Sequence, residues 1–557
     1  KAIAVSQEKK FFHWFLEFPE VFQNGGFDCI LGNPPFLGGQ KLTGTFGTEY
    51  LEYLKLEYAP IGSCDLVTYF FRRIFSILKL NGFQSLISTN TIAQGGAREG
   101  GLQVIESQNG TINFAIRSMK WPGLAAVEVS LLAIHKGKWQ KEFVLDNKKV
   151  KQISTYLDDS EQLGNPFTLK QNEGKSFQGS IVLGMGFILE PRQAEELIKK
   201  NPKNKDVLFP YLNGEDLNSN PDQAPSRWVI NFFDWEEDYC RQNYPDCFEI
   251  VERLVKPERM KLDEKKNSSN KNRKLKWWLF GSDAKSLYKA ISGMERVMVI
   301  ALTSKTVAIE ILPSRYVFAH ATGVFALETN YNFLVLQSNF HFQWAWKYAS
   351  SMKSDLRYTP SDIFESFPFP QNLSKEQEEK LEAIGEKYHK HRKQLMLKMQ
   401  LGLTKTYNQF HNSKLQEASG EWEEMDAKEF GKKNGKETLN LWKHLKKPEA
   451  VCAFNEAVEG IFELRKLHVE MDNSVLEAYG WTDINLKHDF YEVDYLPEND
   501  RIRFTIHPDA RKEILKRLLQ LNHEIHEQEV KAGLWDKKKT SKKKKVDEKN
   551  EDSIEIF

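Results

Sequence analysis

The sequence predicts an α/β fold that begins with a partial doubly wound sheet and continues into an α+β domain and an α-helical extension. A short apolar run over residues 27–31 is followed by a helix-periodic segment and then by another apolar run, and long amphipathic segments fill the last third of the chain. Short apolar runs that alternate with helical periodicity are typical of α/β sheets. With 557 residues and a hydrophobic fraction of 40%, the chain is long enough for about three or four domains.

The first predicted strand leads directly into a stiff loop. Residues 27–31 suit a strand that is buried on both faces of a mostly parallel sheet. Asn33 then precedes Pro34 and Pro35, and each proline fixes its own φ and favours extended geometry in the residue before it. Ligands bind at the carboxyl ends of the strands in open α/β sheets. We therefore expect Asn33 and the ring of Phe36 to face a ligand. The alternative is a proline-rich turn with an incidental asparagine.

A helix and two further strands are predicted after this loop. Apolar residues recur at helical spacing over residues 66–78, and Asp65 stands where a helix N-cap is expected. Residues 83–88 read as the next strand. Residues 127–134 begin in alternation and finish apolar, which indicates a late strand of the same sheet. Trp121 lies at a turn just before that strand.

The composition limits the possible classes of function. The 78 Lys and Arg residues balance 77 Asp and Glu residues, so any affinity for nucleic acid must come from local patches. The five cysteines show no CxxC spacing, and their odd number argues against a disulfide framework, so we expect a cytoplasmic protein. No signal peptide and no apolar run near about 18 residues is found, so we expect no membrane span. The chain lacks an initiator Met, and we expect it to be a fragment.

Asn33-Pro34-Pro35-Phe36 resembles the catalytic loop of amino-methyltransferases, in which the pattern is Asn/Asp/Ser-Pro-Pro-aromatic. The preceding residues 11–22 are similar to the segment before that loop in adenine-specific DNA methyltransferases of the type IIG restriction–modification and phage-defence kind. The resemblance implies a Rossmann-like methyltransferase sheet. It also implies that a flipped adenine stacks on Phe36, while the side-chain oxygen of Asn33 and the carbonyl of Pro34 accept hydrogen bonds from the exocyclic amine.

The implied chemistry is physically sound. An aromatic amine is a poor nucleophile because its lone pair is delocalised into the ring, and two acceptors that hold both amine hydrogens free this lone pair for an electrophilic methyl group. The resemblance therefore implies methyl transfer from S-adenosylmethionine to adenine in specific DNA sequences. Loops of this kind also modify glutamine side chains in release factors and guanine in ribosomal RNA, so the choice of adenine depends on the resemblance. The alternative function is a non-catalytic DNA-binding or scaffold component of a phage-defence complex.

The rest of the implied pocket is less complete. Asp65 corresponds to a residue that lines the adenine pocket and, with Asn33, the methionine end of the cofactor, and Trp121 is a candidate for the second face of the adenine sandwich. Ordinary edge packing is the alternative for Trp121. The expected aromatic-x-Gly-x-Gly cofactor loop is missing before Asn33, and the only similar string, residues 184–187, reads as a bend. We therefore expect residues 1–145 to be the substrate half of the catalytic domain. Its partner would be a cofactor-binding half on the same polypeptide or another subunit.

The second domain is predicted over residues 165–370, where aromatic-rich segments alternate with polar connectors. Its end resembles the end of the target-recognition domain in the same family. Basic residues interleaved with Trp277 and Trp278 suit contacts with the phosphates and sugars of double-stranded DNA, and a solvated loop is the alternative. Arg357 could instead pair with Asp355 or Asp362. The candidate DNA contacts are Lys271, Arg273, Lys274, Lys276, Lys353 and Arg357.

A helical C-terminal domain is predicted over residues 371–535. Ser374 and Gln377 form a capping-box pattern that opens a long helix, and further helices are expected near residues 450–479 and 508–530. The histidines of these helices lack the spacing of a metal site, so we expect none. Residues 536–557 are strongly charged and are predicted to be a disordered tail.

Overall fold

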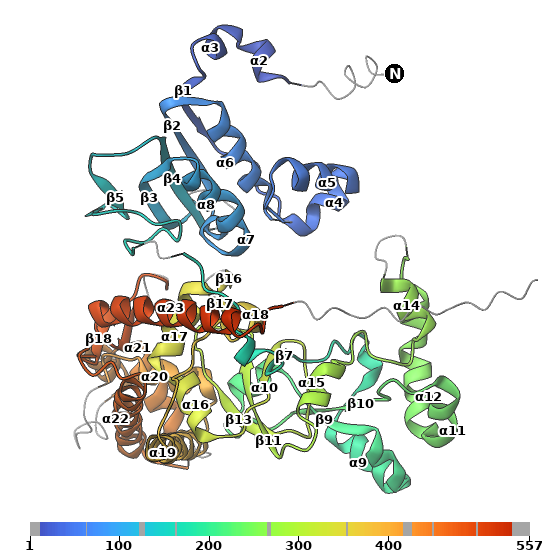
Figure 1. Ribbon diagram of the computed structural model, residues 1–557. Helices are drawn as coiled ribbons and strands as arrows, with labels where there is room; N and C mark the ends of the chain where they lie inside the picture. Colours follow the sequence, from blue (N-terminus) through green and yellow to red (C-terminus); the bar gives the residue numbers. More distant parts are fainter. Residues whose placement is uncertain are drawn as a thin grey trace, which may run out of the picture.

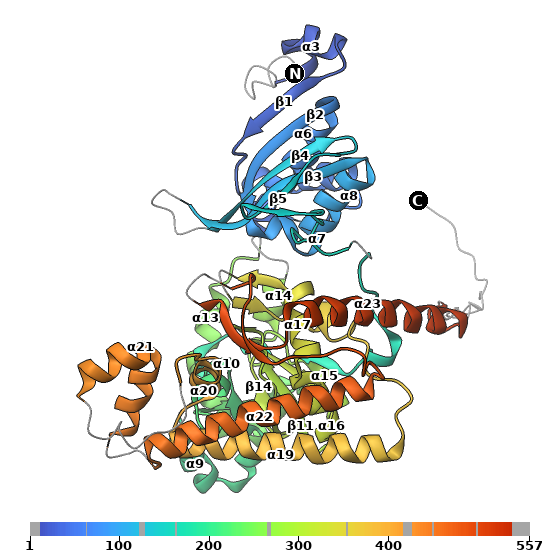
Figure 2. The same cartoon turned by 90° about the vertical axis from the view of Figure 1, so that its left-hand side faces the viewer.

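The computed structural model describes residues 12–62, 64–121, 128–161, 164–264, 269–352, 355–415, 426–447, 451–496 and 500–536. Two bodies are visible in Figures 1 and 2. We call residues 12–150 the sheet domain and residues 166–536 the large module, and the linker between them spans residues 151–165. The sheet domain lies above the large module in both views.

The sheet domain contains a mixed six-stranded sheet with the order β1-β2-β4-β3-β5-β6. β1 is parallel to β2, and β4 lies antiparallel between β2 and β3. The carboxyl ends of β1, β2 and β3 therefore share one edge, which faces the large module in Figure 2. The predicted strands are confirmed, but the sheet is not mostly parallel. The strands are β1 (Phe27–Gly32), β2 (Leu78–Thr89), β3 (Gly110–Lys120), β4 (Glu128–Lys136), β5 (Phe143–Leu145) and β6 (Lys148–Val150).

β1 is an edge strand, and the prediction that it is buried on both faces is wrong. The side chain of Leu31 is 74% exposed, and Cys29 is exposed as well. Burial of a strand depends on its neighbours, and no strand among the described residues pairs with the outer side of β1. The backbone groups on that side are therefore free to pair with another strand.

Helices α6 and α8 cover one face of this sheet, whereas α4 and α5 surround a separate small core. Phe71 and Phe75 of α6 pack with Leu86 of β2 and Leu132 of β4 in one hydrophobic core. On the opposite face, side chains such as Ile87 are half-buried and belong to none of the cores, so the winding is partial. The helices are α2 (Trp14–Glu17), α3 (Pro19–Gln23), α4 (Gly39–Phe46), α5 (Thr48–Glu57), α6 (Leu66–Ile77), α7 (Gly95–Ala97) and α8 (Gln103–Ser107).

The first part of the large module is an α+β arrangement. Its sheets have the orders β14-β9-β10-β8, β13-β11-β15-β7 and β12-β17-β16. Their strands are β7 (Ser176–Gln178), β8 (Ile188–Leu189), β9 (Leu208–Leu212), β10 (Arg227–Ile230), β11 (Arg296–Ala301), β12 (Thr303–Ser304), β13 (Glu310–Pro313), β14 (Val317–Phe318), β15 (Thr322–Phe325), β16 (Ser350–Met352) and β17 (Asp355–Arg357). The helices are α9 (Pro191–Lys200), α10 (Gly214–Ser219), α11 (Glu237–Asn243), α12 (Pro245–Leu254), α13 (Lys256–Met260), α14 (Ser269–Leu275), α15 (Lys285–Ala290), α16 (Asn330–Gln337), α17 (Asn339–Tyr348) and α18 (Pro360–Ile363).

The second part of the large module consists mainly of long helices. The capping box of Ser374 and Gln377 is confirmed at the start of α19. A short hairpin of β18 (Asp489–Glu492) and β19 (Ile502–Thr505) lies before the last helix. None of the helices in the described ranges is both long and apolar enough to cross a membrane. These helices are α19 (Lys375–Met399), α20 (Leu403–Phe410), α21 (Ala427–Leu445), α22 (Phe454–Ala478) and α23 (Pro508–Lys531).

One hydrophobic core joins the two parts of the large module. Fully buried residues such as Phe333 of α16 and Trp344 of α17 share this core with Leu381 of α19 and Val475 of α22. Packing is therefore continuous across residue 370. The division into separate domains at that residue stays a prediction.

Candidate active site and DNA interface

The loop after β1 presents its polar group to solvent. Asn33 is exposed, whereas Pro34 is buried and Phe36 packs half-buried against the core of the sheet domain. The side chain of Asn33 makes no hydrogen bond with the described residues, so its amide is available to a ligand. The buried proline fixes the backbone beneath this amide because its ring restricts φ.

Asp65 ties this loop to helix α6. Its Oδ1 accepts hydrogen bonds from the backbone N–H of Val67, at 3.1 Å, and of Leu37, at 3.2 Å. The N–H of Leu66 in turn donates to the carbonyl of Leu37, at 2.9 Å. The predicted N-cap is confirmed. One carboxylate therefore orders both the start of α6 and the chain directly after Phe36.

Two neighbouring groups are held in their neutral forms. Burial raises the pKa of the Cys64 thiol, and it also raises the pKa of the Tyr69 phenol. The Tyr69 hydroxyl donates a hydrogen bond to the carbonyl of Gly62, at 2.7 Å. Both side chains therefore stay protonated near neutral pH, and they serve to support the loop.

Trp121 lies at the same edge of the sheet as Asn33. It directly follows β3, whose carboxyl end shares this edge with the carboxyl end of β1. Its ring does not contact the ring of Phe36 among the described aromatic pairs, so the structure does not contain a formed sandwich. Residues 122–127 of the adjoining turn lie outside the described residues.

An aromatic row that the sequence analysis missed follows the loop. The side chains of Phe46, Tyr50 and Tyr53 are 49%, 37% and 54% exposed. The ring centroids of Phe46 and Tyr50 are 5.0 Å apart, and those of Tyr50 and Tyr53 are 6.4 Å apart. Phe46 ends α4, whereas Tyr50 and Tyr53 lie three residues apart on one face of α5, and this spacing was the available signal. Exposed rings of this kind offer surfaces on which bases can stack.

The predicted basic patch contains two free cations. Lys271 and Lys276, on and directly after α14, are exposed and form no ion pair with the described residues. Lys274 is 3.2 Å from a carboxylate oxygen of Glu264, and Nη1 of Arg273 donates to the side chain of Asn270, at 3.3 Å. Lys271 and Lys276 are therefore the better candidates for contacts with DNA phosphates.

The two tryptophans beside this patch do not face a ligand, which corrects the predicted interleaving. Trp277 and Trp278 are only 4% and 6% exposed and belong to a second hydrophobic core. The indole N–H of Trp278 donates to the carbonyl of Trp235, at 2.9 Å. Burial of these large rings stabilises the domain, so they anchor the basic segment.

A buried arginine adds positive charge next to the patch. Arg259 is 2% exposed, and its Nη2 donates to the carbonyl of Leu183, at 2.7 Å. Burial and the neighbouring Arg273 lower the pKa of Arg259 to about 10. Nε and Nη1 of Arg259 have no hydrogen-bond partner in the described part of the chain.

The remaining predicted contacts lie near the end of the α+β part. Arg357 of β17 is exposed. It forms no ion pair with Asp355 or Asp362, so the pairing that was the alternative to a DNA contact is not observed. Lys353 lies outside the described residues.

Residues 184–187 form a short turn in which Gly184 has a φ of 140°, and a Cβ on Gly186 would lie 2.4 Å from Leu254. The predicted bend is confirmed.

Two family models match separate parts of the chain. Residues 2–109 match the family model described as Eco57I restriction-modification methylase, and residues 175–371 match the one described as MmeI, target recognition domain. This chain resembles the restriction–modification methylases. The first match contains Asn33 and Asp65, and the second contains α14 and Arg357. We name the sheet domain the methylase domain, and the α+β part the target-recognition domain, after the family models that match them.

The solved structure of the type IIL restriction-modification enzyme MmeI in complex with DNA shares this fold. The similarity has a TM-score of 0.62 with 17% sequence identity, and it covers 90% of this chain and 57% of the MmeI chain. The chain thus spans little more than half the length of that enzyme. The DrdV–DNA complex (12% identity, 83% of this chain and 58% of that chain) has a TM-score of 0.32, which is too low to bear on the fold. No curated protein sequence matched the chain.

Proposed function

We propose that this chain is the substrate-binding part of an adenine-specific DNA methyltransferase in a restriction–modification or phage-defence system. The observation that carries this proposal is the exposed, unpaired amide of Asn33 on a loop that the buried Pro34 and the carboxylate of Asp65 hold in place. A catalytic acceptor must be fixed before the transition state forms, because reorganisation would cost part of the rate enhancement. The match to a restriction-modification methylase agrees with this role.

Each residue of the loop has a role in this proposal. The Oδ1 atom of Asn33 and the carbonyl of Pro34 accept hydrogen bonds from the exocyclic amine of adenine, and the nitrogen lone pair becomes available for methylation. The ring of Phe36 stacks on the base, and Trp121 closes over its second face. The base reaches this edge only when it is flipped out of the duplex, at a cost of about a few kcal/mol of unstacking.

S-adenosylmethionine is the methyl donor that this chemistry requires, and it supplies the electrophilic methyl group when it is bound. In this proposal, Asn33 and Asp65 hold its methionine end. No strand–turn–helix unit in the described residues carries the aromatic-x-Gly-x-Gly string that would cradle its adenosine. We infer that another part of the polypeptide, or another subunit, provides that half of the site. The exposed outer side of β1 and the half-buried face at Ile87 support this inference, because both can accept further elements of a doubly wound sheet.

Double-stranded DNA is the proposed partner of the target-recognition domain. The exposed Lys271, Lys276 and Arg357 would contact phosphates, since none of them is paired within the described chain. The five cysteines are free, which agrees with the proposed cytoplasmic location.

The decisive experiment replaces Asn33 with Ala in a complete enzyme that contains this chain and the cofactor-binding half. We expect the methylation rate to fall by about 10²–10³-fold with little change in DNA affinity, because the amide acts mainly in the transition state. Asn24→Ala, an exposed asparagine before the other end of β1, is the matched control and should methylate normally. Near-normal turnover of Asn33→Ala would contradict the assignment.

A non-catalytic DNA-binding or scaffold role is the second candidate. The complete wild-type assembly would then bind DNA without transferring methyl groups from radiolabelled S-adenosylmethionine. A methyl group on a base other than adenine would support the chemistry of the loop and correct the substrate.

A further inference from the structure

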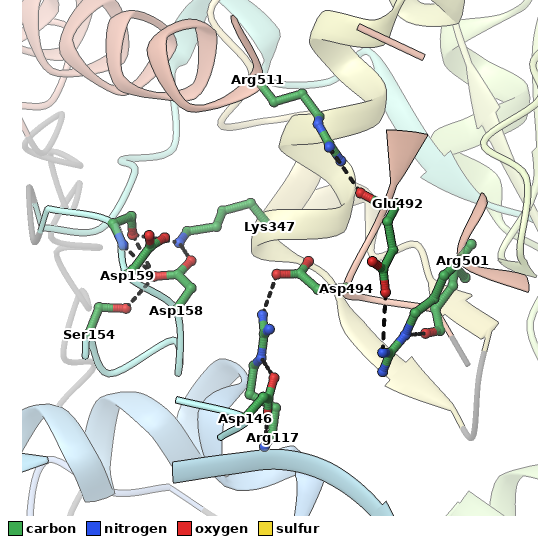
Figure 3. Close-up of polar contacts among 12 residues, drawn as sticks. Arg117, Asp146, Ser154, Asp158, Asp159, Lys347, Glu492, Asp494, Arg501 and Arg511 are labelled. Atoms are coloured by element: carbon green, nitrogen blue, oxygen red, sulfur yellow. Dashed lines mark hydrogen bonds and ion pairs between the residues drawn. The ribbon is translucent and has the colours of Figure 1, made fainter. Parts of the chain in front are cut away.

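An ion pair joins the methylase domain directly to the C-terminal hairpin. Nη1 of Arg117, on β3, pairs with the carboxylate of Asp494, between β18 and β19 (Figure 3). Asp146 holds the same arginine from the other side. One oxygen of Asp146 accepts from Nε of Arg117, at 2.7 Å, and the other accepts from its backbone N–H, at 2.9 Å.

A β-bulge turns Arg117 toward these partners. The pairing of β3 with β4 shifts register between Ile116 and Met119. Bulges of this kind redirect side chains and are frequent next to active sites. The bulge lies just before Trp121, so the arginine fixes the part of β3 that leads to the candidate base pocket.

The large module presents Asp494 from a well-packed turn. Val493 and Leu496 on either side of it are 1% and 3% exposed. The ring of Tyr495 stacks on Trp346 of α17, with centroids 4.6 Å apart. The side chain of Asp494 itself is 58% exposed, whereas that of Arg117 is 24% exposed. The residues beside Asp494 are therefore packed against the large module, although the carboxylate itself reaches into solvent.

The charges around Arg117 favour its pairing with Asp494. Burial alone would lower the pKa of Arg117, but Asp494 and Asp146 raise it above the ordinary value of arginine. Exposed ion pairs often contribute little because two flexible side chains must be ordered. Arg117 is already ordered by Asp146, so pairing with Asp494 costs less entropy than usual.

Helix α17 links this contact to the interdomain linker. Lys347, which directly follows Trp346, pairs with Asp158 of the linker and donates to the hydroxyl of Ser160, at 3.1 Å (Figure 3). Its ammonium lies 4.3 Å from the ring centroid of Tyr156. The same helix therefore supports both the turn that carries Asp494 and the linker.

The hairpin also contacts the strands that carry a candidate DNA contact. Asp500, just before β19, pairs with Lys305. Lys305 directly follows β12, in which Thr303 is the register partner of Arg357. A short series of contacts thus leads from Arg357 through the hairpin to Arg117.

We propose that Arg117 and Asp494 are positioning residues that fix the carboxyl edge of the methylase sheet relative to the target-recognition domain. A base extruded from DNA on that domain then meets Asn33 in one defined place. The statement about the base rests on the proposed function, whereas the statement about the arrangement of the two bodies does not.

The first experiment measures this arrangement in the full chain. Spin labels are attached at Ser107→Cys on α8 and Glu376→Cys on α19, with Cys29 and Cys64 replaced by Ser, and pulsed spin resonance gives the distance distribution. We expect one narrow distribution for the parent chain. Asp494→Asn should increase the population at other distances about two- to fivefold. Asp494→Glu keeps the charge and should restore the narrow distribution.

The control is Asp489→Asn, which removes one exposed acidic group from the same hairpin without breaking an interdomain pair. It should leave the distribution unchanged. An unchanged distribution for Asp494→Asn would overturn the proposal, as would equal broadening by both variants.

The second experiment separates positioning from binding in the complete enzyme. Asp494→Asn should lower kcat for methylation about two- to fivefold, with KM and DNA affinity unchanged. A rise in KM with unchanged kcat would overturn the positioning role. If the wild-type enzyme transfers no methyl group, the proposed function fails, and the distance measurement still decides the role of the pair.

Discussion

The loop of Asn33 in the methylase domain and the core of the large module differ in whether their polar side chains have partners within the described chain. In the methylase domain, Asn33 is exposed and unpaired, and the neighbouring strand β1 is open along one side. In the large module, Glu310 and Arg392 are fully buried, and Nη2 of the arginine lies 2.9 Å from the carboxylate. The loop of Asn33 keeps a polar group available for a partner, whereas the core of the large module has already paired these two charged groups. Under the proposed function, the loop is a site for binding, and the packed core supports it.

Breaking the buried pair should have the largest effect. Arg392→Met leaves the carboxylate of Glu310 without its guanidinium, and removal of one partner of a buried pair typically costs about 3–5 kcal/mol. We expect this loss in the free energy of unfolding of the large module, measured by urea denaturation. The double variant Glu310→Gln with Arg392→Met is the control, and it should be more stable than the single variant. A single variant that unfolds like the wild type would contradict this account.

Acid should weaken the same region. Burial raises the pKa of Glu310, but Arg392 and His389 lower it further, to about 2 from its ordinary value of 4.5. A carboxyl group with a depressed pKa contributes stability above pH 4.5, and this contribution is lost as the pH falls toward about 2. The free energies of unfolding of the wild type and Glu310→Gln, plotted against pH, should therefore converge as the pH falls over this range. Parallel curves would show that another group controls acid unfolding.

Addition of the cofactor-binding half should protect the amides on the exposed outer side of β1 from hydrogen exchange. In the chain alone, the amides on the outer side of this strand should exchange hydrogen rapidly, because no strand in the described ranges pairs with them. Addition of the cofactor-binding half should slow their exchange at least about tenfold.

The same chain alone should bind S-adenosylmethionine poorly in calorimetry. Micromolar binding would mean that this chain contains a cofactor site of its own.

The sequence was informative where local chemistry decides the structure. The strand at β1, the cap at Asp65 and the capping box at Ser374 follow from patterns within a few residues, and the structure contains all three. The edge position of β1 could not be predicted, because burial depends on which strands lie beside it. The burial of Trp277 has the same cause, since its partners, such as Phe248, are distant in sequence.

The candidate site shows the same limit. The sequence identified Asn33 and Phe36 by their spacing to the prolines, but no helix was expected directly after them. The structure instead contains helix α4 from Gly39 onward, and this helix begins the exposed aromatic row. The contact of Arg117 with Asp494 joins positions 377 residues apart, so no local pattern could reveal it.

The basic patch tests whether exposed charges of the large module are available to a partner, as the amide of Asn33 is proposed to be. Replacement of Lys271 and Lys276 with Ala should reduce the slope of log affinity against log salt by about 0.9 for each lost phosphate contact. Lys274→Ala should have a smaller effect, because Glu264 already pairs with this lysine. Lys375→Ala, at the exposed start of α19, is the control. An unchanged slope for the double variant would show that the patch is a solvated loop.

The smallest expected effect separates two roles of Asp65. Asp65→Ala removes the acceptor for the N–H groups of Val67 and Leu37, and loss of an N-cap typically costs about 1 kcal/mol. Asp65→Asn keeps a side-chain oxygen and is an equally good cap, so its thermal stability should stay near that of the wild type. If the negative charge also serves the substrate or cofactor, the Asn variant should retain stability and lose methylation in the complete enzyme. If both stability and methylation are retained, Asp65 acts through the cap and the loop alone. Because both variants change the side chain that accepts a hydrogen bond from Leu37, the comparison shows whether the loop of Asn33 requires only order or also charge.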